Sequence, residues 1–299
     1  MAIGDIFEVE GTRDLYCLDT GLYGTPNYGA IYIYDTARPT VIETSTGRNH
    51  AVLLDALDEL GIAKADLQNI VLTHIHLDHA GGAGFLAADC PNAEVFVHEI
   101  GAPFMAEPDQ LVDGVKRVIG ELWDYHRVPI PIPKDRITPL SDGDEIDLGD
   151  QGLDVIHVPG HATHQVALYD EQSNALFTAD EAGMWLPAHD LLTVTTPPTT
   201  FDLERNLNNL ERLGDLTPTT LLYTHFGPRS ADNALEAYGV LLADWVADIE
   251  AKREELDDDA VIEHFVSTAD LSLALDTPAG TEPTRMFVKG VFEYLDRTD

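Results

Sequence analysis

Four candidate metal ligands lie within six residues of this chain, directly after an apolar run typical of a buried strand. The segment is His74-Ile75-His76-Leu77-Asp78-His79, and the apolar run covers residues 69–73. A loop held by such a strand can direct several side chains toward one point. The glycine pair Gly81-Gly82 is expected to let the backbone turn sharply before the next helix. A polar loop without a metal role could easily contain one histidine. It is a poor explanation for three histidines and an aspartate at this spacing.

The mixture of imidazole and carboxylate ligands predicts the kind of metal. These donors suit Zn²⁺, Fe²⁺ and Mn²⁺, and metal availability often decides among such ions. We therefore expect divalent metal ions at this loop, with zinc as the first choice and iron or manganese as alternatives.

The pattern of apolar residues indicates an α/β chain with strands in both halves. Strands are expected at 14–19, 28–34, 40–43, 69–73, 93–98, 144–148, 153–158, 165–170, 175–178 and 220–223. Helices are expected at 50–60, 84–88, 110–125, 201–213, 231–255 and 285–296, and residues 187–200 form the least regular stretch. Two β-rich halves, each followed by helices, predict sheets inside and helices outside.

Further motifs follow other predicted strands in a fixed order. They are Pro159-Gly160-His161, Phe177-Thr178-Ala179-Asp180 and Thr224-His225-Phe226-Gly227-Pro228. Together with the H-x-H-x-D-H segment, this order resembles the metallo-β-lactamase superfamily along most of the chain. The resemblance implies a four-layered αβ/βα sandwich. It also implies a catalytic core over residues 1–230 and a helical C-terminal region over 231–299, packed on the core.

The resemblance also implies two metal sites. His74, His76 and His161 would hold the first ion, Asp78, His79 and His225 would hold the second, and Asp180 would bridge both. Three neutral histidines leave one coordination position open for water, whose pKa a metal lowers toward 7. Asp78 is then expected to orient the resulting hydroxide.

The segment His157-Val158-Pro159-Gly160-His161-Ala162-Thr163 is similar to a motif of the glyoxalase II and lactonase branch. This similarity implies hydrolysis of a small-molecule thioester or ester. A lactonase, a metal-dependent nuclease or phosphodiesterase, and a metal-binding sensor without turnover remain alternatives. The residues proposed to contact substrate are His164, Tyr23, Met184 and Trp185. The remaining histidines without a motif, His126 among them, are expected to be surface or packing residues.

A formal net charge of −36 sets this chain apart from ordinary soluble domains. It disfavours nucleic acids and anionic membranes as partners, because both require Lys and Arg contacts. Repulsion among so many carboxylates weakens when molar salt shortens the screening length to about 3 Å. The sequence therefore predicts a cytoplasmic protein of a high-salt cytosol. It is compatible with a homo-oligomer, and its two cysteines, Cys17 and Cys90, are expected to be free thiols.

Overall fold

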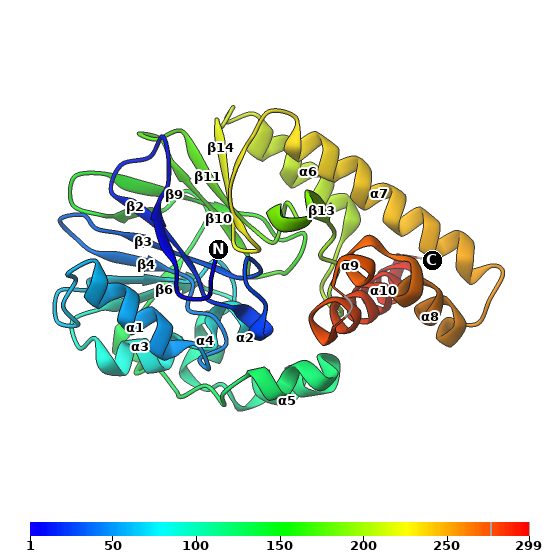
Figure 1. Ribbon diagram of the computed structural model, residues 1–299, viewed down its shortest axis with the longest axis horizontal. Coiled ribbons are helices and arrows are strands. Elements are labelled where there is room, and N and C mark those ends of the chain that lie inside the picture. Colours follow the sequence, from blue (N-terminus) through cyan, green and yellow to red (C-terminus); the bar gives the residue numbers. More distant parts are fainter. Residues whose placement is uncertain (276, 299) are drawn as a thin grey trace.

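The computed structural model describes residues 1–275 and 277–298, so residues 276 and 299 of the predicted C-terminal region lie outside the described residues. Within the described ranges, two mixed sheets form a sandwich (Figure 1). The first sheet has the order β1 (Ile6–Glu8), β2 (Leu15–Asp19), β3 (Ala30–Tyr34), β4 (Thr40–Ile42), β5 (Asn69–Val71), β6 (Glu94–His98), β7 (Ile137–Leu140). The second has the order β15 (Gly227–Ser230), β14 (Thr220–Tyr223), β11 (Ala175–Ala179), β10 (Val166–Asp170), β9 (Gly152–His157), β8 (Glu145–Asp147).

Helices cover the outer faces of both sheets (Figure 1). On the first sheet lie α1 (His50–Glu59) and α3 (Ala83–Asp89), and on the second lie α6 (Leu203–Gly214) and α7 (Ala234–Arg253). The short elements are η1 (Leu22–Gly24), α2 (Leu77–Ala80), α4 (Ala102–Ala106), α5 (Asp109–Val118), η2 (Gly120–Tyr125), η3 (Lys134–Arg136), β12 (Met184–Leu186), η4 (Pro187–His189) and β13 (Leu191–Thr193). The chain ends in α8 (Asp258–Thr268), α9 (Asp270–Ala274) and α10 (Pro278–Thr298).

Alternation along the strands explains why both faces of each sheet are buried. In β3, Tyr32 and Tyr34 point into the layer between the sheets, whereas Ile31 and Ile33 pack under the outer helices. A strand buried on both faces is apolar at nearly every position, as β3 is. The predicted αβ/βα layering is confirmed.

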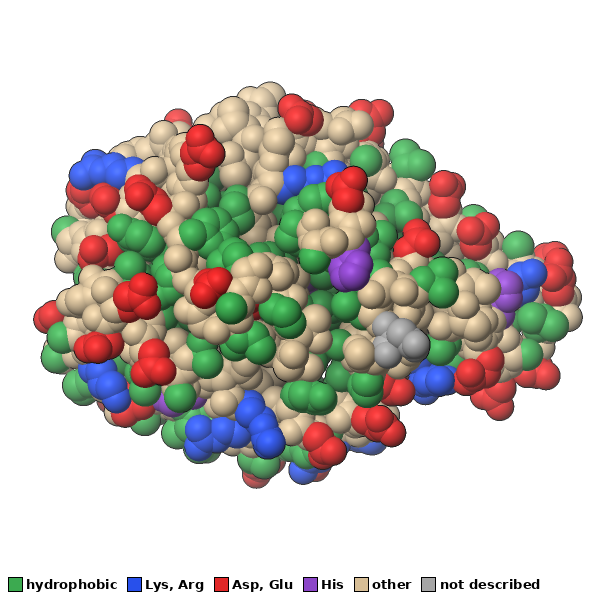
Figure 2. Space-filling view, in the orientation of Figure 1, with side chains coloured by type: hydrophobic (Ala, Val, Ile, Leu, Met, Phe, Trp, Pro, Cys, Tyr) green, Lys and Arg blue, Asp and Glu red, His purple; other side chains and the backbone are tan. Residues whose placement is uncertain are grey.

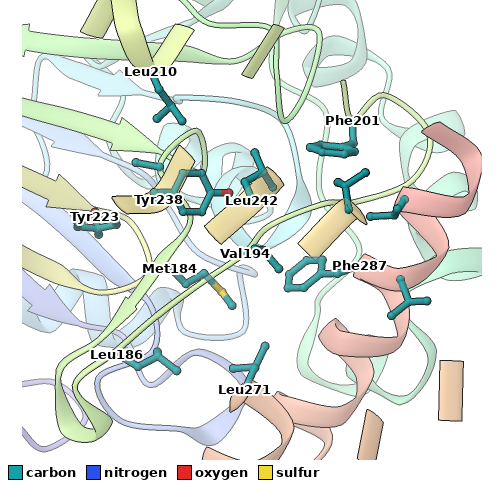
Figure 3. Close-up of a cluster of buried hydrophobic side chains, with 14 of the residues drawn as sticks. Met184, Leu186, Val194, Phe201, Leu210, Tyr223, Tyr238, Leu242, Leu271 and Phe287 are labelled. Atoms are coloured by element: carbon teal, nitrogen blue, oxygen red, sulfur yellow. The ribbon is translucent and has the colours of Figure 1, made fainter. Parts of the chain in front are cut away.

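The C-terminal helices share one hydrophobic cluster with the second sheet. Figure 3 shows Phe287 of α10 beside Met184 and Val194, which belong to the strand pair β12–β13 and its continuation. Phe287 also accepts a hydrogen bond at its carbonyl oxygen from the Thr196 hydroxyl, at 2.9 Å. These contacts fix the loop around residues 196–198 against α10. The division of the chain at residue 230 stays a prediction.

Gly290 allows α10 to approach that loop closely. A Cβ atom at this position would collide with the carbonyl oxygen of Thr196 and the backbone of Pro197 and Pro198. We expect Gly290→Ala to lower the free energy of unfolding by about 1–3 kcal/mol, as overpacking does. Gly239→Ala in α7 is the control, since its nearest neighbours lie at an ordinary 3.5 Å. Urea unfolding should show that Gly290→Ala destabilises the protein and that the control does not; equal effects would contradict the close approach.

Several predicted elements differ from the structure. The helix expected at 110–125 breaks into α5 and η2, because Gly120 adopts a left-handed φ of 55°. The stretch 187–200 is more regular than expected, since β13 pairs with β12. Strands β1 and β7 and helices α8 and α9 were not predicted, and all are short or weakly patterned. Cys17 and Cys90 are both free and buried, as expected.

Among the helices of the described residues, none combines the length and the apolar composition that a bilayer crossing requires.

Candidate metal centre

The residues of the predicted centre come from strand ends of both sheets. His74 and His76 follow β5 of the first sheet, whereas His161, Asp180 and His225 follow β9, β11 and β14 of the second. Backbone hydrogen bonds join the sheets at this edge. The Val166 amide donates to the Thr73 carbonyl, and the Ala30 amide donates to the Thr224 carbonyl, each at 2.8 Å.

The segment His74–His79 is not the simple loop that the sequence suggested. His76 precedes the helical turn α2, and Asp78 and His79 lie on that turn. The glycine pair does not form the sharp turn that was expected, because Gly81 and Gly82 have ordinary helical φ angles of −61° and −86°. It allows close packing instead. A Cβ on Gly82 would collide with the Thr44 carbonyl oxygen.

The first group of ligands is a triad of histidines. The Nδ1 atom of His76 lies 3.1 Å from Nε2 of His74 and 3.1 Å from Nε2 of His161. Two nitrogens bound to one tetrahedral zinc at 2.0–2.1 Å would stand about 3.3 Å apart. The spacing of these three nitrogens therefore fits a single divalent ion.

The second group combines two histidines with a carboxylate. The Nε2 atoms of His79 and His225 lie 3.1 Å apart. The Oδ2 atom of Asp78 lies 3.8 Å from Nε2 of His79 and 3.7 Å from Nε2 of His225. All three ligand atoms lie within 4.8 Å of one another, so they can also surround one cation.

Asp180 faces both groups with different oxygens. Its Oδ2 lies 3.5 Å from Nε2 of His161, and its Oδ1 lies 3.5 Å from Nε2 of His79. The side chain is almost fully buried, with 4% of the residue exposed. This is the arrangement expected of a carboxylate that bridges two metal ions.

Outer hydrogen bonds orient the histidine rings. Nδ1 of His161 donates to the Thr195 carbonyl at 3.2 Å, and Nδ1 of His225 donates to the Tyr28 carbonyl at 3.0 Å. Each bond leaves the Nε2 lone pair directed into the centre, as in known metal sites.

Asp180 is held in place from several directions. The Thr224 hydroxyl donates to its Oδ1 at 3.1 Å, and the Thr195 hydroxyl donates to its carbonyl oxygen at 2.7 Å. The Asp180 amide donates to Oε1 of Gln165 at 3.3 Å. The Asp180 side chain is therefore held in position by the protein itself.

Glu181 is a buried carboxylate that ties the ligand segments together. It accepts hydrogen bonds from the His161 amide at 3.0 Å, Gln165 Nε2 at 2.7 Å and Asn209 Nδ2 at 2.7 Å. Burial raises the pKa of Glu181 to about 8, although the hydrogen bonds from Asn209 and His161 oppose this shift. Sequence analysis did not single out Glu181, which directly follows Asp180.

Burial keeps the histidines of the first triad neutral. It lowers the pKa of His76 to about 3 and that of His161 to about 4, so both rings have a free lone pair at neutral pH. It also lowers the pKa of His74 well below its usual value. Neutral imidazole is the form that binds metal.

The second group attracts positive charge. Burial alone would lower the pKa of His79, but the carboxylates of Asp180 and Asp78 outweigh it and raise this pKa to about 10. Burial would raise the pKa of Asp180, but His79 and His225 hold it below its usual value. A cation entering this group must therefore displace a proton from His79.

Glu43 also faces the second group and was missed from the sequence. Its Oε2 lies 3.6 Å from Nδ1 of His79, and its Oε1 accepts the Thr73 amide at 3.2 Å. Glu43 has a left-handed φ of 72°, and Ala179, next to Asp180, has one of 49°. Such conformations cost about 1–3 kcal/mol and gather at functional sites. The only sequence signal was the acid at the end of the apolar run 40–43.

A cavity of about 330 Å³ opens beside the ligands, and His76, Asp78, Asp180 and His225 line one end of it. Of the residues predicted to contact substrate, Tyr23, His164 and Met184 line this cavity. Nδ1 of His164 also accepts the Ile75 amide at 3.4 Å.

Trp185 is not among the residues that line the cavity. Successive side chains of a strand point to opposite faces, so Met184 of β12 faces inward and Trp185 faces away. The Trp185 ring instead packs under the guanidinium of Arg229, 4.1 Å from the ring centre.

His126 lines the cavity, whereas a surface or packing role was expected of it. It is buried and donates from Nδ1 to the Leu122 carbonyl at 2.9 Å. Its ring lies 5.8 Å from that of Tyr23. No motif surrounds His126, so sequence offered no signal for this position.

Comparisons with known proteins identify the family and the relatives of this chain. The family model of the metallo-beta-lactamase superfamily matches residues 24–225. ST1585, a metallo-beta-lactamase fold-containing protein of Sulfurisphaera tokodaii, is 26% identical over 219 residues, which are 72% of this chain and 79% of that relative. The crystal structure of ST1585, there assigned to Sulfolobus tokodaii, has a TM-score of 0.71 at 22% identity. That match covers 94% of this chain and 99% of the other, and it shows the same fold.

Two relatives with named activities match over shorter stretches. An acyl-coenzyme A thioesterase of Bos taurus is 34% identical over 117 residues, which are 37% of this chain and 39% of the relative. A hydroxyacylglutathione hydrolase of Aeromonas salmonicida is 29% identical over 181 residues, which are 58% of this chain and 56% of the relative.

Proposed function

Because this chain belongs to the metallo-beta-lactamase superfamily and is a metallo-hydrolase, we propose that it cleaves a thioester or ester at a centre of two divalent metal ions. The position of Asp180 carries this proposal, since its two oxygens face different ligand groups at 3.5 Å. We propose His74, His76 and His161 as ligands of the first ion, and Asp78, His79 and His225 as ligands of the second. Zinc is the first choice of metal, with iron or manganese as alternatives.

Bound metal ions would supply Lewis acidity and a water of lowered pKa. The chain itself supplies a carboxylate to orient the attacking water. Burial would raise the pKa of Asp78, but His79 and His225 hold it well below its usual range. Asp78 therefore stays ionised and can accept a hydrogen bond from that water. The water oxygen adds to the carbonyl carbon, the C–S or C–O bond breaks, and the leaving thiolate or alkoxide takes up a proton.

The lining of the cavity favours esters and thioesters over phosphodiesters. Among the described residues that line it, none is Lys or Arg, the side chains that usually hold phosphate. The thioesterase and hydroxyacylglutathione hydrolase relatives support thioester chemistry, although each matches only part of its length. A lactone is a cyclic ester, so a lactonase remains the second candidate.

A substrate panel tests the reaction. Protein loaded with Zn²⁺ is assayed with S-lactoylglutathione, an octanoyl thioester, an acyl-homoserine lactone and bis(p-nitrophenyl) phosphate, and His76→Ala serves as the inactive control. We expect thioester cleavage by the wild type alone. Cleavage of the lactone in preference to both thioesters would favour the second candidate, a lactonase. Preferred cleavage of the phosphodiester would overturn the proposal. No turnover on any of them by a fully metal-loaded protein would favour a sensor.

We further propose that this enzyme works in a high-salt cytosol. Figure 2 shows Asp and Glu side chains spread over the whole visible face, with few Lys and Arg side chains among them. The screening length falls from about 10 Å at 0.1 M salt to about 3 Å at 1 M, so salt should relieve their repulsion.

Melting temperature should therefore rise steeply between 0.1 M and 2 M KCl, roughly the range over which screening becomes complete. The matched variant combines Asp55→Asn, Asp58→Asn and Glu59→Gln, three exposed carboxylates of α1. Its melting temperature should depend less on KCl than that of the wild type. A wild-type melting temperature that stays flat or falls across this range would rule out the salt adaptation.

A further inference from the structure

The cavity beside the metal ligands has one end with charged groups and a largely apolar remainder. Beyond the metal-ligand end, two helical walls and residues 195 and 197–200 line it. One wall is formed by α5 and η2, with Leu111, Val115 and Leu122, and the other by α10, with Pro283, Met286 and Phe287. In Figure 1, α5 lies below both α2 and α10. Helix α2 carries Asp78 and His79.

Helix α5 is amphipathic, and its apolar face is turned toward the cavity. Leu111, Val115 and Val118 recur at helical spacing and line the cavity, whereas Lys116 and Arg117 are exposed. Because Leu111, Val115 and Val118 are only partly buried, the space in front of them is open to an apolar ligand.

The charges of the cavity are confined to its metal-ligand end. Asp78, Asp180 and the histidines lie there, and the described lining holds no Lys or Arg. Polar groups on the other walls, such as Gln110 and Thr200, are uncharged. A carboxylated group like that of glutathione would lose its hydration here without gaining a cationic partner. An alkyl chain would instead be bound more tightly with each methylene removed from water.

We propose that this cavity binds an apolar acyl chain of the substrate, and that Gly114 of α5 sets the length of chain admitted. This inference rests on the proposed ester or thioester hydrolysis. The scissile carbonyl would lie at the metal-ligand end, and the acyl chain would extend between α5 and α10. The leaving thiol or alcohol would remain toward solvent.

Gly114 leaves part of this space free. It lines the cavity, and a Cβ atom built on it meets no atom within 4 Å. Its backbone is helical, so an ordinary side chain at this position requires no unusual backbone conformation. Glycine within a helix is less favourable than alanine, so helix stability does not account for it. A large side chain at this position would project into the cavity and shorten it.

The test compares Gly114→Trp with the matched control Gly214→Trp. Gly214 also has no atom within 4 Å of a built Cβ, but it ends α6, is exposed and does not line the cavity. The substrates are acetyl, hexanoyl and decanoyl thioesters of N-acetylcysteamine, with zinc-loaded protein. We expect wild-type kcat/KM to rise with chain length. Gly114→Trp should lose about tenfold or more on the decanoyl thioester and keep its acetyl activity within about twofold. Gly214→Trp should match the wild type.

A wild type that prefers acetyl to decanoyl thioesters would overturn the inference, as would equal losses on all chains in Gly114→Trp. Binding of n-alkanols, measured by calorimetry on the same zinc-loaded proteins, tests the apolar site independently of hydrolysis. It therefore distinguishes an error in the acyl-site inference from an error in the hydrolase proposal. Tighter binding with each added methylene, weakened by Gly114→Trp, would support the apolar site even if no thioester were cleaved. Length-independent cleavage without alkanol binding would retain the hydrolase and remove the acyl site.

Discussion

Asp180→Ala is expected to reduce hydrolysis about 10³-fold and to lower metal content from two ions per chain toward one. Each carboxylate oxygen of Asp180 faces a different ligand group, at 3.5 Å from His161 and 3.5 Å from His79. If Asp180 bridges two ions as proposed, its loss would remove a ligand from both and several kcal/mol of transition-state stabilisation. About 1.4 kcal/mol corresponds to each factor of ten in rate. Elemental analysis and kcat/KM on the best thioester of the panel measure the two effects.

The control is Asp170→Asn. Asp170 is also a buried aspartate, but it accepts hydrogen bonds from the Tyr34 hydroxyl and the Ser173 amide and does not line the cavity. This variant should lose stability while keeping both ions and its rate per folded molecule. If Asp180→Ala retained two ions at full occupancy, the bridging role would be wrong.

Removal of the two proposed metal ions by a chelator is expected to lower the melting temperature by about 16–32 °C. Each ion at a free concentration about a thousandfold above its dissociation constant stabilises a fold by about 4 kcal/mol, so two ions contribute about 8 kcal/mol. In a chain somewhat smaller than this one, 1 kcal/mol shifts the melting temperature by about 2–4 °C. Without cations, the oxygens of Asp180, Glu43 and Asp78 remain around the ring nitrogens of His79, at 3.5, 3.6 and 3.8 Å. Calorimetry before and after dialysis against EDTA measures the shift.

A proton on His79 moderates this loss, because Asp180 and Asp78 raise the pKa of His79 to about 10. The metal-free protein should therefore remain folded at neutral pH and melt earlier. Added Zn²⁺ should restore the melting temperature of the wild type, and EDTA should shift Asp180→Ala much less. If EDTA removed the metal from the wild type and the melting temperature did not change, the ligand cluster would bind no stabilising ion.

Much of the fold and of the ligand cluster could be predicted from sequence, because strand patterns are local and the order of the ligand motifs resembles the metallo-β-lactamase superfamily. Alternation in β3 places Ile31 and Ile33 on one face and Tyr32 on the other. Short ligand motifs directly after strands place side chains at one edge of a sandwich. The structure brings His74, His76, His161, Asp180 and His225 to that edge together with Asp78 and His79.

What sequence could not predict depends on contacts between distant segments. His126 reaches the cavity because the α5–η2 segment crosses in front of the centre, and no local pattern indicates that path. Glu43 is at a strand end like many other acids, and only the fold brings it within 3.6 Å of His79. Trp185 was assigned to the substrate as an aromatic residue of the segment 184–189, and the alternation of β12 directs its side chain away from the cavity.

The distribution of ligands between the two sheets bears on how the holoprotein matures. The first triad takes His74 and His76 from one half of the chain and His161 from the other, and the second takes Asp78 and His79 from one half and His225 from the other. A half that folds first therefore offers only two of the three donors of either group. If the two groups bind metal as proposed, high-affinity uptake would follow closure of the sandwich, and each bound ion would slow the separation of the halves.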